Sequence, residues 1–471
     1  MKKLSSRRAF FIPGSEAPDR VPAAIAFISL LSAFFLAGGA RDDLISLLIW
    51  RPLSAFLLAI SIVLCWASAW QRGKPLVILC ISVVALVAIH LVPLPPEIWV
   101  SLPGRNIVVE TYQSVGMDLP WQPLSMAQAR TWNALFSLAG PFAVMLAVLS
   151  LDRSRHQQLL QLLIILGMIS GILGMIQAIG PANGPLYFYR ITNGTASVGL
   201  FANRNHQAIF LATLYPLLAA NLSLFKGRPD RLFFYRSMTI AGAALLVPLI
   251  LMTGSRSGLL LAAIGMFSAW WVYRPPVAEG RVAGINSAHR TRLVGMSIAA
   301  ILLMVVLVVA IRTPALQRLI DTDAASELRI QALPVIGQAI SRFFPFGSGI
   351  GTFVETYQIF EPDSFVAASY FNHAHNDFAE LLMTGGIAAV LLFLWAIWIG
   401  IGWFISLLRN RRIAKDEQGF GLQMLGRAGF SVLVMLALAS AADYPLRTPS
   451  IMLYAMVMAA WCSSAHKFAR K

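Results

Sequence analysis

The sequence predicts an all-α, polytopic integral membrane protein with about twelve transmembrane helices and a large outer loop between the ninth and the tenth. Of its 471 residues, 58% are hydrophobic and 12% are charged, and the charged fraction is about half that of a soluble domain. The apolar residues form runs that are long enough to cross about 30 Å of hydrocarbon. The basic residues stand in short clusters between these runs, as is typical of the loops of a membrane protein.

The net charge of +16 does not indicate a nucleic-acid partner, because the Lys and Arg side chains form no single basic patch in the sequence. We therefore expect membrane lipids as the surroundings and no nucleic acid as a ligand. Cys65, Cys80 and Cys462 all lie inside apolar runs. They are expected to be small core residues that form neither a disulfide nor a metal site.

About twelve apolar segments approach or reach the length of a membrane span, roughly 17 to 25 residues. Their predicted limits are 21–40, 52–70, 75–92, 132–151, 159–179, 206–225, 237–252, 257–273, 293–311, 386–408, 425–442 and 449–465. No cleavable signal peptide is expected, since the charged start leads into an apolar stretch that continues as a full span.

The distribution of basic residues predicts that both termini are cytoplasmic. With that orientation, most of the 37 Lys and Arg residues fall in cytoplasmic segments, in agreement with the positive-inside rule. The clusters include Arg153/Arg155, Lys226/Arg228/Arg231/Arg236 and Arg409/Arg411/Arg412/Lys415.

Three connections on the outer side are too long to be simple turns, namely 93–131, 180–205 and 312–385. The chain accordingly divides into spans 1–9 within 1–311, the third outer loop, and spans 10–12 within 386–471. Loops of such length seldom lack a function. In the third loop, apolar residues near helical spacing over 326–344 predict an amphipathic helix that is interrupted or restarted at Pro334.

A first group of candidate site residues lies in the segment FANRNH, at the mouth of the sixth span. It contains Asn203, Arg204, Asn205 and His206. Two interpretations are open here. In the first, an asparagine caps the helix and its neighbours anchor the chain at the membrane interface. In the second, these side chains contact a ligand.

Two arginines on the outer side are further candidates. Arg256 lies in the turn TGSRSG between two short spans, and Arg329 begins the amphipathic segment of the third loop. Arg256 is either a snorkelling interfacial residue or the partner of an anion, whereas Arg329 alone would be an ordinary solvated charge. The glycine-rich segment GSGIGTF, 347–353, lacks the Lys-Ser/Thr of a phosphate loop, so we interpret it as a tight backbone bend.

His373 and His375 stand in the segment FNHAHNDF, before the tenth span. They could form a metal site, a structural pair or an acid/base group. The metal interpretation is the weakest, because Phe378 stands where zinc hydrolases of similar pattern carry another histidine. Acid/base chemistry is favoured, since an imidazole with a pKa of about 6.5 is mostly neutral near pH 7 and can take a proton from a hydroxyl.

The segment HNDFAELLMTGG resembles the signature of the O-antigen ligase and O-antigen polymerase superfamily. In that signature His-Asn precedes nine variable residues and a Gly, here His375, Asn376 and Gly386. Arg256 begins an element similar to the family's Arg-x-x-x-Leu, and FANRNHQA resembles its asparagine-rich segment. Arg329 with the downstream PFGSGIGTF resembles the elements of the family's last large loop.

This resemblance implies an inverting, metal-independent glycosyl transfer at the periplasmic face of the bacterial inner membrane. The donor would be an undecaprenyl-diphosphate-linked glycan. The acceptor would be a hydroxyl of a glycan, of lipid A core or of another molecule. No cofactor is implied.

In this interpretation Arg256 and Arg329 bind the donor diphosphate with Arg204 in reserve, because a guanidinium offers paired donors to phosphate oxygens. His375 is the base that activates the acceptor hydroxyl. Asn376 either orients the helix start or bonds a sugar. The residues that would position the acceptor or a sugar are His373, Asn376, Asn203 and Asn205.

A transporter or flippase of lipid-linked glycans is the alternative from another class. Transporters usually place ionisable groups near the bilayer midplane. Here His90 lies within a predicted span, whereas the charged candidates gather at the outer surface, which favours surface chemistry. Within the superfamily, a ligase, a polymerase and an O-linked protein oligosaccharyltransferase share these motifs and stay open as alternatives.

Overall fold

The structure is a computed structural model that describes residues 20–276, 324–366, 370–409 and 417–469. Within these residues the chain is mainly helical, and the only strands are the short antiparallel pair β1 (Pro93–Leu94) and β2 (Gln122–Pro123). The all-α prediction is therefore confirmed for this part of the chain. The predicted span 293–311 lies outside the described residues.

Each of the other predicted spans corresponds to a helix or to one leg of a bent helix, except 132–151, which covers both α5 and α6. The helices are α1 (Arg20–Leu36), α2 (Leu47–Ile89), α5 (Gln128–Ser137), α6 (Ala139–Ser150), α7 (Arg153–Ile179), α8 (Arg204–Ser223), α9 (Pro229–Leu251), α10 (Arg256–Val272), α15 (Asp377–Arg409), α16 (Glu417–Ser440) and α17 (Pro449–Ala469). Six of the described helical stretches are long and apolar enough to cross a membrane, as expected of a multi-pass membrane protein. The count of twelve spans stays a prediction.

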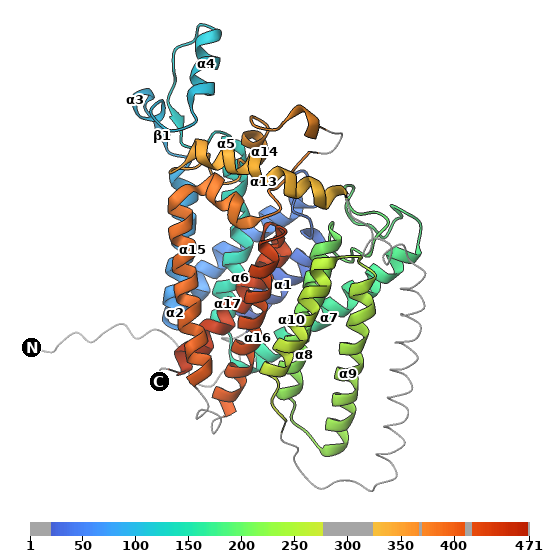
Figure 1. The fold of residues 1–471 in the computed structure, drawn as a ribbon. Coiled ribbons are helices and arrows are strands. Elements are labelled where there is room, and N and C mark those ends of the chain that lie inside the picture. The colour runs from blue at the N-terminus through green and yellow to red at the C-terminus, as the bar shows by residue number, and fades with distance from the viewer. Residues whose placement is uncertain (1–19, 277–323, 367–369, 410–416, 470–471) are drawn as a thin grey trace, which may run out of the picture.

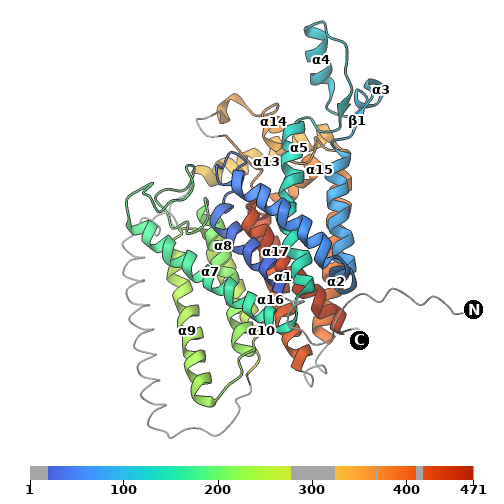
Figure 2. The ribbon, with the colours of Figure 1, turned by 180° about the vertical axis from the view of Figure 1, so that it is seen from behind.

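α2 bends sharply at Gly73, where the backbone has φ −142° and ψ 34°. The two legs correspond to the predicted spans 52–70 and 75–92, and Figure 2 shows them meeting at one end of the molecule. A Cβ atom at position 73 would lie 2.7 Å from the side chain of Leu149 in α6. A larger residue at this position would have to displace the methyl groups of Leu149, so glycine allows the close approach of the bend to α6.

α15 is interrupted in a similar way at Gly386, where φ is 59° and ψ is −155°. The long leg after this residue is the predicted span 386–408. A positive φ favours glycine, and a Cβ atom here would lie 2.1 Å from the carbonyl oxygen of Pro345. The bend sets the angle between the membrane-spanning leg and the segment that carries the two candidate histidines.

α8 lies inside the bundle, because every side chain from His206 to Ser223 is buried. It packs against α7, α9, α10 and α16, while α17 packs against α2, α6 and α16 (Figure 1). On the outer helices, large apolar side chains such as Val63 (79% exposed) and Trp398 (73% exposed) face outward. This distribution suits a bundle whose solvent is lipid.

A second layer covers one end of the bundle. It consists of α13 (Ala324–Phe343), α14 (Phe353–Tyr357), η2 (Asp363–Phe365) and the first leg of α15, and α13 runs across the bundle in Figure 1. Its hydrophobic core comprises Ala332, Val335, Ile336, Ala339, Phe343, Phe353, Tyr357, Ala374 and Met383. The amphipathic helix predicted for 326–344 is confirmed, but Pro334 lies inside a continuous α13 and does not interrupt it.

The first outer loop forms a lobe that projects from this layer (Figure 1). The lobe contains β1, α3 (Pro96–Trp99), α4 (Asn106–Ser114) and β2. Arg105 joins it to the glycine-rich bend, because its guanidinium donates to the carbonyl oxygens of Leu124 at 2.6 Å and Gly347 at 3.2 Å.

The segment 347–353 is the tight bend that the sequence predicted. Gly347, Gly349 and Gly351 have φ angles of 80°, 112° and 90°, which glycine adopts without a steric penalty. The backbone N–H of Ile350 donates to Nδ1 of His90 at 3.1 Å. His90 thus lies directly after α2, which ends at residue 89.

We call the opposite end of the bundle, which contains the bend of α2 with Arg72 and the end of α17 with Lys467, the basic end. Arg72, at the bend of α2, donates to the carbonyl oxygen of Leu151 at 2.6 Å and lies 3.7 Å from the carboxylate of Asp152. Lys467, near the end of α17, donates to the carbonyl oxygen of Gln71. The predicted topology likewise places these turns on one side. Which side faces the cytoplasm stays a prediction.

Candidate functional site

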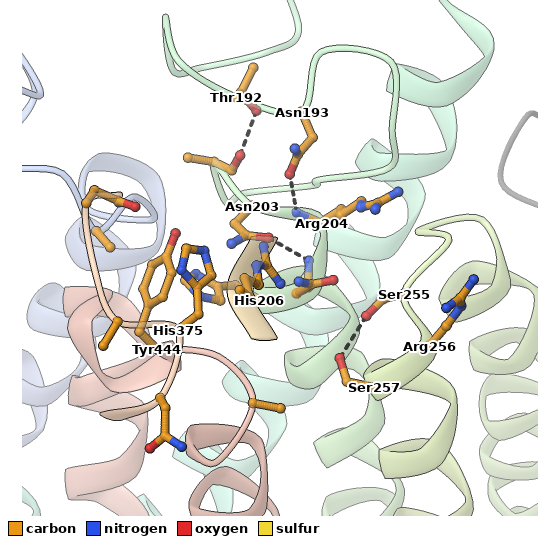
Figure 3. A pocket seen from close by; sticks show the side chains of 18 of the residues that line it. Thr192, Asn193, Asn203, Arg204, His206, Ser255, Arg256, Ser257, His375 and Tyr444 are labelled. Atoms are coloured by element: carbon orange, nitrogen blue, oxygen red, sulfur yellow. Dashed lines mark hydrogen bonds between the residues drawn. The ribbon is translucent and has the colours of Figure 1, made fainter. Parts of the chain in front are cut away.

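A cavity of about 830 Å³ lies beneath α13, at the end of the bundle opposite the basic end. The starts of α8 and α10 contribute to it, together with the loops 191–195, 372–376 and 441–444. Segments that are far apart in the sequence therefore meet in one space, which Figure 3 shows from close by.

The cavity brings together seven of the eight residues that the sequence singled out. They are Asn203, Arg204, Asn205, Arg256, Arg329, His375 and Asn376. His373 is not among the lining residues. In Figure 3, His375 lies on one side of the cavity and Arg256 on the other, with Arg204 above the space between them.

The composition of the lining points to an anionic, hydroxyl-rich ligand. Among the described residues that line the cavity, four are arginines, five are asparagines and none is Asp or Glu. A concave surface with one sign of charge concentrates ligands of the opposite charge. Guanidinium groups bind phosphate and carboxylate oxygens in pairs, whereas amides exchange hydrogen bonds with hydroxyls.

His375 is held in an uncommon backbone conformation, with φ 51°. For a residue with a Cβ atom this left-handed region is strained, and such strain often occurs at functional sites. Its Nδ1 lies 3.0 Å from the carbonyl oxygen of His373. Because a carbonyl can only accept, Nδ1 carries the proton and Nε2 is left with a lone pair.

Burial lowers the pKa of His375 below its usual value, and the positive charge of Arg329 lowers it further, although Asp443 acts in the opposite direction. Both principal effects disfavour the imidazolium ion. The ring is therefore neutral near pH 7, which is the protonation state that a general base requires.

His373 belongs to a buried ionic network and not to the cavity wall. Its Nδ1 lies 3.1 Å from Oε1 of Glu380. Arg447, in η4 (Pro445–Arg447), lies 3.5 Å from the same carboxylate oxygen and donates to Asp377 at 3.0 Å. The structure thus does not bring His373 to the place where it was expected to position an acceptor. The network of His373, Glu380, Asp377 and Arg447 connects the loop before α15 to the turn between α16 and α17.

The predicted asparagines first serve the backbone. The side-chain oxygen of Asn203 accepts from the N–H of Asn205 at 2.8 Å and caps α8. The side-chain oxygen of Asn376 accepts from the N–H groups of Phe378 (3.1 Å) and Ala379 (3.0 Å), so it orients the start of α15. Two interpretations made from the sequence, a capping asparagine before α8 and an orienting role for Asn376, are therefore confirmed.

The turn between α16 and α17 supplies residues that the sequence reasoning missed. Asp443, 1% exposed, accepts from the amide of Asn205 at 2.8 Å and lies 3.9 Å from Nε2 of His206. Burial opposes the ionisation of Asp443, but the neighbouring groups, chiefly His206, outweigh it and lower the pKa of the carboxyl. A negative charge is thus fixed behind the cavity wall.

Tyr444 forms the centre of an aromatic cluster next to Asp443. Its ring centroid lies 5.1 Å from that of His206, 4.6 Å from that of His373 and 4.9 Å from that of His375. The pKa of Tyr444 is raised to about 12, mainly by burial, so the phenol stays protonated. The signal that could have revealed this turn is the sequence DYPLR, in which an Asp and an Arg stand between two apolar spans.

The two principal arginines come from different elements. Arg256 is the first residue of α10, whose cap is Ser255, with Oγ accepting from the N–H of Gly258 at 3.1 Å. A helix N-terminus favours anions. Arg329 comes from α13 and is close enough to His375 to affect the pKa of its imidazole. Among the described residues, no three His, Cys, Asp or Glu side chains are grouped to hold a metal ion.

Residues 241–394 match the family model described as O-antigen ligase. The chain carries an O-antigen ligase domain. The membership in the O-antigen ligase and polymerase superfamily that the motifs suggested is thereby confirmed. The O-antigen ligase match includes Arg256, Arg329 and His375, whereas Asn203 and Arg204 precede it. A comparison with curated proteins gave no match.

At the level that this O-antigen ligase match supports, the chain is a multi-pass membrane enzyme of the glycosyltransferase type. Its partners are, in general, a lipid-linked glycan and an acceptor. The O-antigen ligase match also contains α10 and the first part of the long leg of α15, so the matched segment extends beyond the cavity wall.

Proposed function

We propose that this protein transfers a glycan from an undecaprenyl-diphosphate carrier to an acceptor hydroxyl, with inversion and without a metal ion, at the periplasmic face of the bacterial inner membrane. The observation that carries the proposal is the convergence of Arg204, Arg256, Arg329 and His375 on one cavity. A diphosphate needs cationic donors, and an attacking hydroxyl needs a base.

The arginines would stabilise the departing diphosphate. As the bond between the anomeric carbon and the diphosphate oxygen breaks, the electron pair moves to that oxygen and negative charge builds there. Guanidinium groups bind such oxygens in bidentate fashion and stay charged at all relevant pH values. Each charge-assisted contact contributes about 1.5–3 kcal/mol. Two such contacts would provide part of the roughly 8 kcal/mol or more by which enzymes lower barriers.

His375 would act as the general base. Its Nε2, which holds the lone pair, takes the proton of the acceptor hydroxyl while the hydroxyl oxygen attacks the anomeric carbon opposite the leaving group. A single displacement of this kind inverts the configuration. The imidazolium that forms would be stabilised by the carboxylate of Asp443, whose charge already acts on the ring. General-base catalysis contributes about 10²–10⁴-fold.

The decisive experiment uses the purified full-length protein in detergent, where no gradient across a membrane exists. Lipid-diphosphate glycan and acceptor, both extracted from a strain that lacks this protein, are incubated with it, and products are analysed by mass spectrometry. We expect a new glycosidic bond of inverted configuration that forms equally well with EDTA. A transporter or flippase would make no bond, so an absence of product with folded protein would refute the proposal.

The acceptor class can be read from the same deletion strain. If the protein is a polymerase, single repeat units accumulate on the lipid carrier. If it is a ligase, long chains accumulate there. An O-linked protein oligosaccharyltransferase would instead leave glycoproteins unmodified while the other glycans stay normal.

A further inference from the structure

The cavity has a second polar region, built from the turn between α1 and α2 and from Tyr370. Arg41 donates through Nε to one carboxylate oxygen of Asp43 at 2.9 Å and through a terminal nitrogen to the other at 3.1 Å. It also donates to the hydroxyl of Tyr370 at 2.8 Å, and its guanidinium lies 5.2 Å from the centre of the Tyr370 ring. Both Arg41 and Tyr370 line the cavity.

This region differs in charge from a phosphate site. The carboxylate of Asp43 engages Arg41 through both oxygens, so it offsets the charge of Arg41. A third member, Arg190, lies 4.0 Å from the same carboxylate. An ion pair that is fixed in this way offers oriented hydrogen-bond donors and acceptors without a strong field, which suits a neutral ligand that carries many hydroxyls.

The ring of Tyr370 adds an apolar surface beside these polar groups. Tyr370 is 45% exposed, so its ring is accessible while its hydroxyl is held by Arg41. Aromatic rings combine a rigid apolar face with a polar tip. Ligand sites that place a few polar groups around such a face bind molecules with both kinds of surface. A pyranose ring is such a molecule, since its C–H groups form an apolar face and its hydroxyls lie around the edge.

The neighbouring loop contributes further hydrogen-bonding groups. Thr192 donates its hydroxyl proton to the carbonyl oxygen of Ala202 at 2.9 Å, which leaves the hydroxyl oxygen as an acceptor. The side-chain oxygen of Asn193 accepts from the N–H of Arg204 at 3.0 Å, which directs its NH₂ group to other acceptors. Figure 3 shows Thr192 and Asn193 together above the cavity, next to Arg204.

We propose that Arg41, Tyr370, Thr192 and Asn193 form a sugar subsite that binds one pyranose ring of the glycan substrate, apart from the diphosphate region at Arg256. This inference rests on the proposed function, because it assigns a glycan to the same cavity. The bound ring can belong to the donor or to the acceptor, and both sources present the same chemistry. Because Asn193 also holds the backbone of Arg204, the subsite is linked to the reacting region.

Binding of a glycan without phosphate tests the subsite directly. The probe is the oligosaccharide released by mild acid from the lipid carrier of the deletion strain, and saturation-transfer NMR measures its contact with the full-length protein in nanodiscs. We expect Tyr370→Ala to weaken binding by about three- to tenfold. Tyr370→Phe keeps the ring and loses the bond to Arg41, so it should fall between the wild type and Tyr370→Ala.

Trp121→Ala is the matched control. Trp121 is an exposed aromatic residue (65%) in the lobe, and it does not line the cavity. Its replacement should leave the saturation-transfer signal unchanged. Equal signals for the wild type and Tyr370→Ala would overturn the proposal. Because Tyr370 is 45% exposed, its replacement should not unfold the protein, so a loss of signal reports on binding.

Steady-state kinetics separate the two sources of the sugar. A rise of KM for the acceptor alone in Tyr370→Ala assigns the subsite to the acceptor, whereas a rise of KM for the lipid-linked donor alone assigns it to the donor. Unchanged KM values for both would refute a role in the reaction. This failure is distinct from a failure of the proposed function, in which the wild-type protein would form no glycosidic bond at all.

Discussion

The two ends of the bundle differ in how deeply their charged side chains are buried. At the basic end, Arg72 donates to a backbone carbonyl and pairs loosely with Asp152, whose side chain is 69% exposed. At the cavity end, Asp443 and Glu380 are each 1% exposed and pair with imidazole or guanidinium groups. Exposed charges cost little to hold, whereas buried ones cost several kcal/mol unless they are paired. The difference agrees with the proposed division of roles, in which the basic end serves membrane topology and the cavity end serves chemistry.

The largest effect is expected from His375→Ala, which removes the proposed base. Transfer should fall by about 10²–10⁴-fold, because no other group accepts the hydroxyl proton with the same geometry. The rate of product formation by purified protein is the measurement, with size-exclusion profiles to verify folding. Wild-type rates in this variant would eliminate His375 as the base and weaken the contrast between the two ends.

A large loss of stability is expected from Arg447→Met. The substitution keeps the apolar volume but leaves the buried carboxylates of Asp377 and Glu380 without their cation. Removing one partner of a buried ion pair costs about 3–5 kcal/mol. Thermal unfolding in detergent would show this as a lower Tm. An unchanged Tm would show that the buried network of Arg447, Asp377 and Glu380 does not stabilise the fold.

Arg256→Ala tests the diphosphate contact. The loss of one charge-assisted contact of about 1.5–3 kcal/mol should reduce kcat/KM by about 10- to 150-fold. Arg256→Lys keeps the charge but not the bidentate geometry and should recover only part of the loss. Full recovery by lysine would mean that the site needs a charge and not the shape of the guanidinium group.

The pH dependence offers a smaller but sharper test. His375 can act as a base only while its imidazole ring is neutral. When the pH falls below the pKa of the ring, the ring becomes protonated and can no longer accept a proton. Since burial and Arg329 lower that pKa, kcat/KM should stay constant from pH 8 down past about 6.5 and fall only below it. Arg329→Gln removes the positive charge that lowers the pKa of His375. The fall of kcat/KM at acid pH should therefore begin at a higher pH in this variant, even if the maximal kcat/KM also changes. An acid limb that stays in place would exclude the coupling between Arg329 and His375.

The smallest effect is expected at the basic end. Arg72→Met removes the loose ion pair with Asp152 and the hydrogen bond to the carbonyl oxygen of Leu151, which should lower stability by less than about 3 kcal/mol and leave transfer unchanged. Measured beside Arg447→Met, it provides the matched control for the contrast between the ends. A loss as large as that of Arg447→Met would show that the basic end also depends on its charges for stability.

The sequence predicted most of the long helices and seven of the residues that line the cavity, because apolar length and the motif residues are local properties. It did not predict that the turn with Asp443, Tyr444 and Arg447 completes the site, since a short connection between two spans carries little information about its partners. It also did not predict that His373 lies outside the lining of the cavity. Two histidines separated by one residue share a face of an extended chain, but His375 has a positive φ. Both rings lie against Tyr444, yet their Nδ1 atoms have different hydrogen-bond partners.

That backbone angle at His375 has a consequence for saturation libraries at this position. Glycine, asparagine and aspartate visit left-handed geometry most readily. Variants with these residues should therefore assemble best, while none of them can replace an imidazole. A screen for abundance would then retain these residues together with histidine, whereas a screen for glycan product would retain histidine alone. At position 375, the effect of a substitution on folding and its effect on catalysis could then be measured separately.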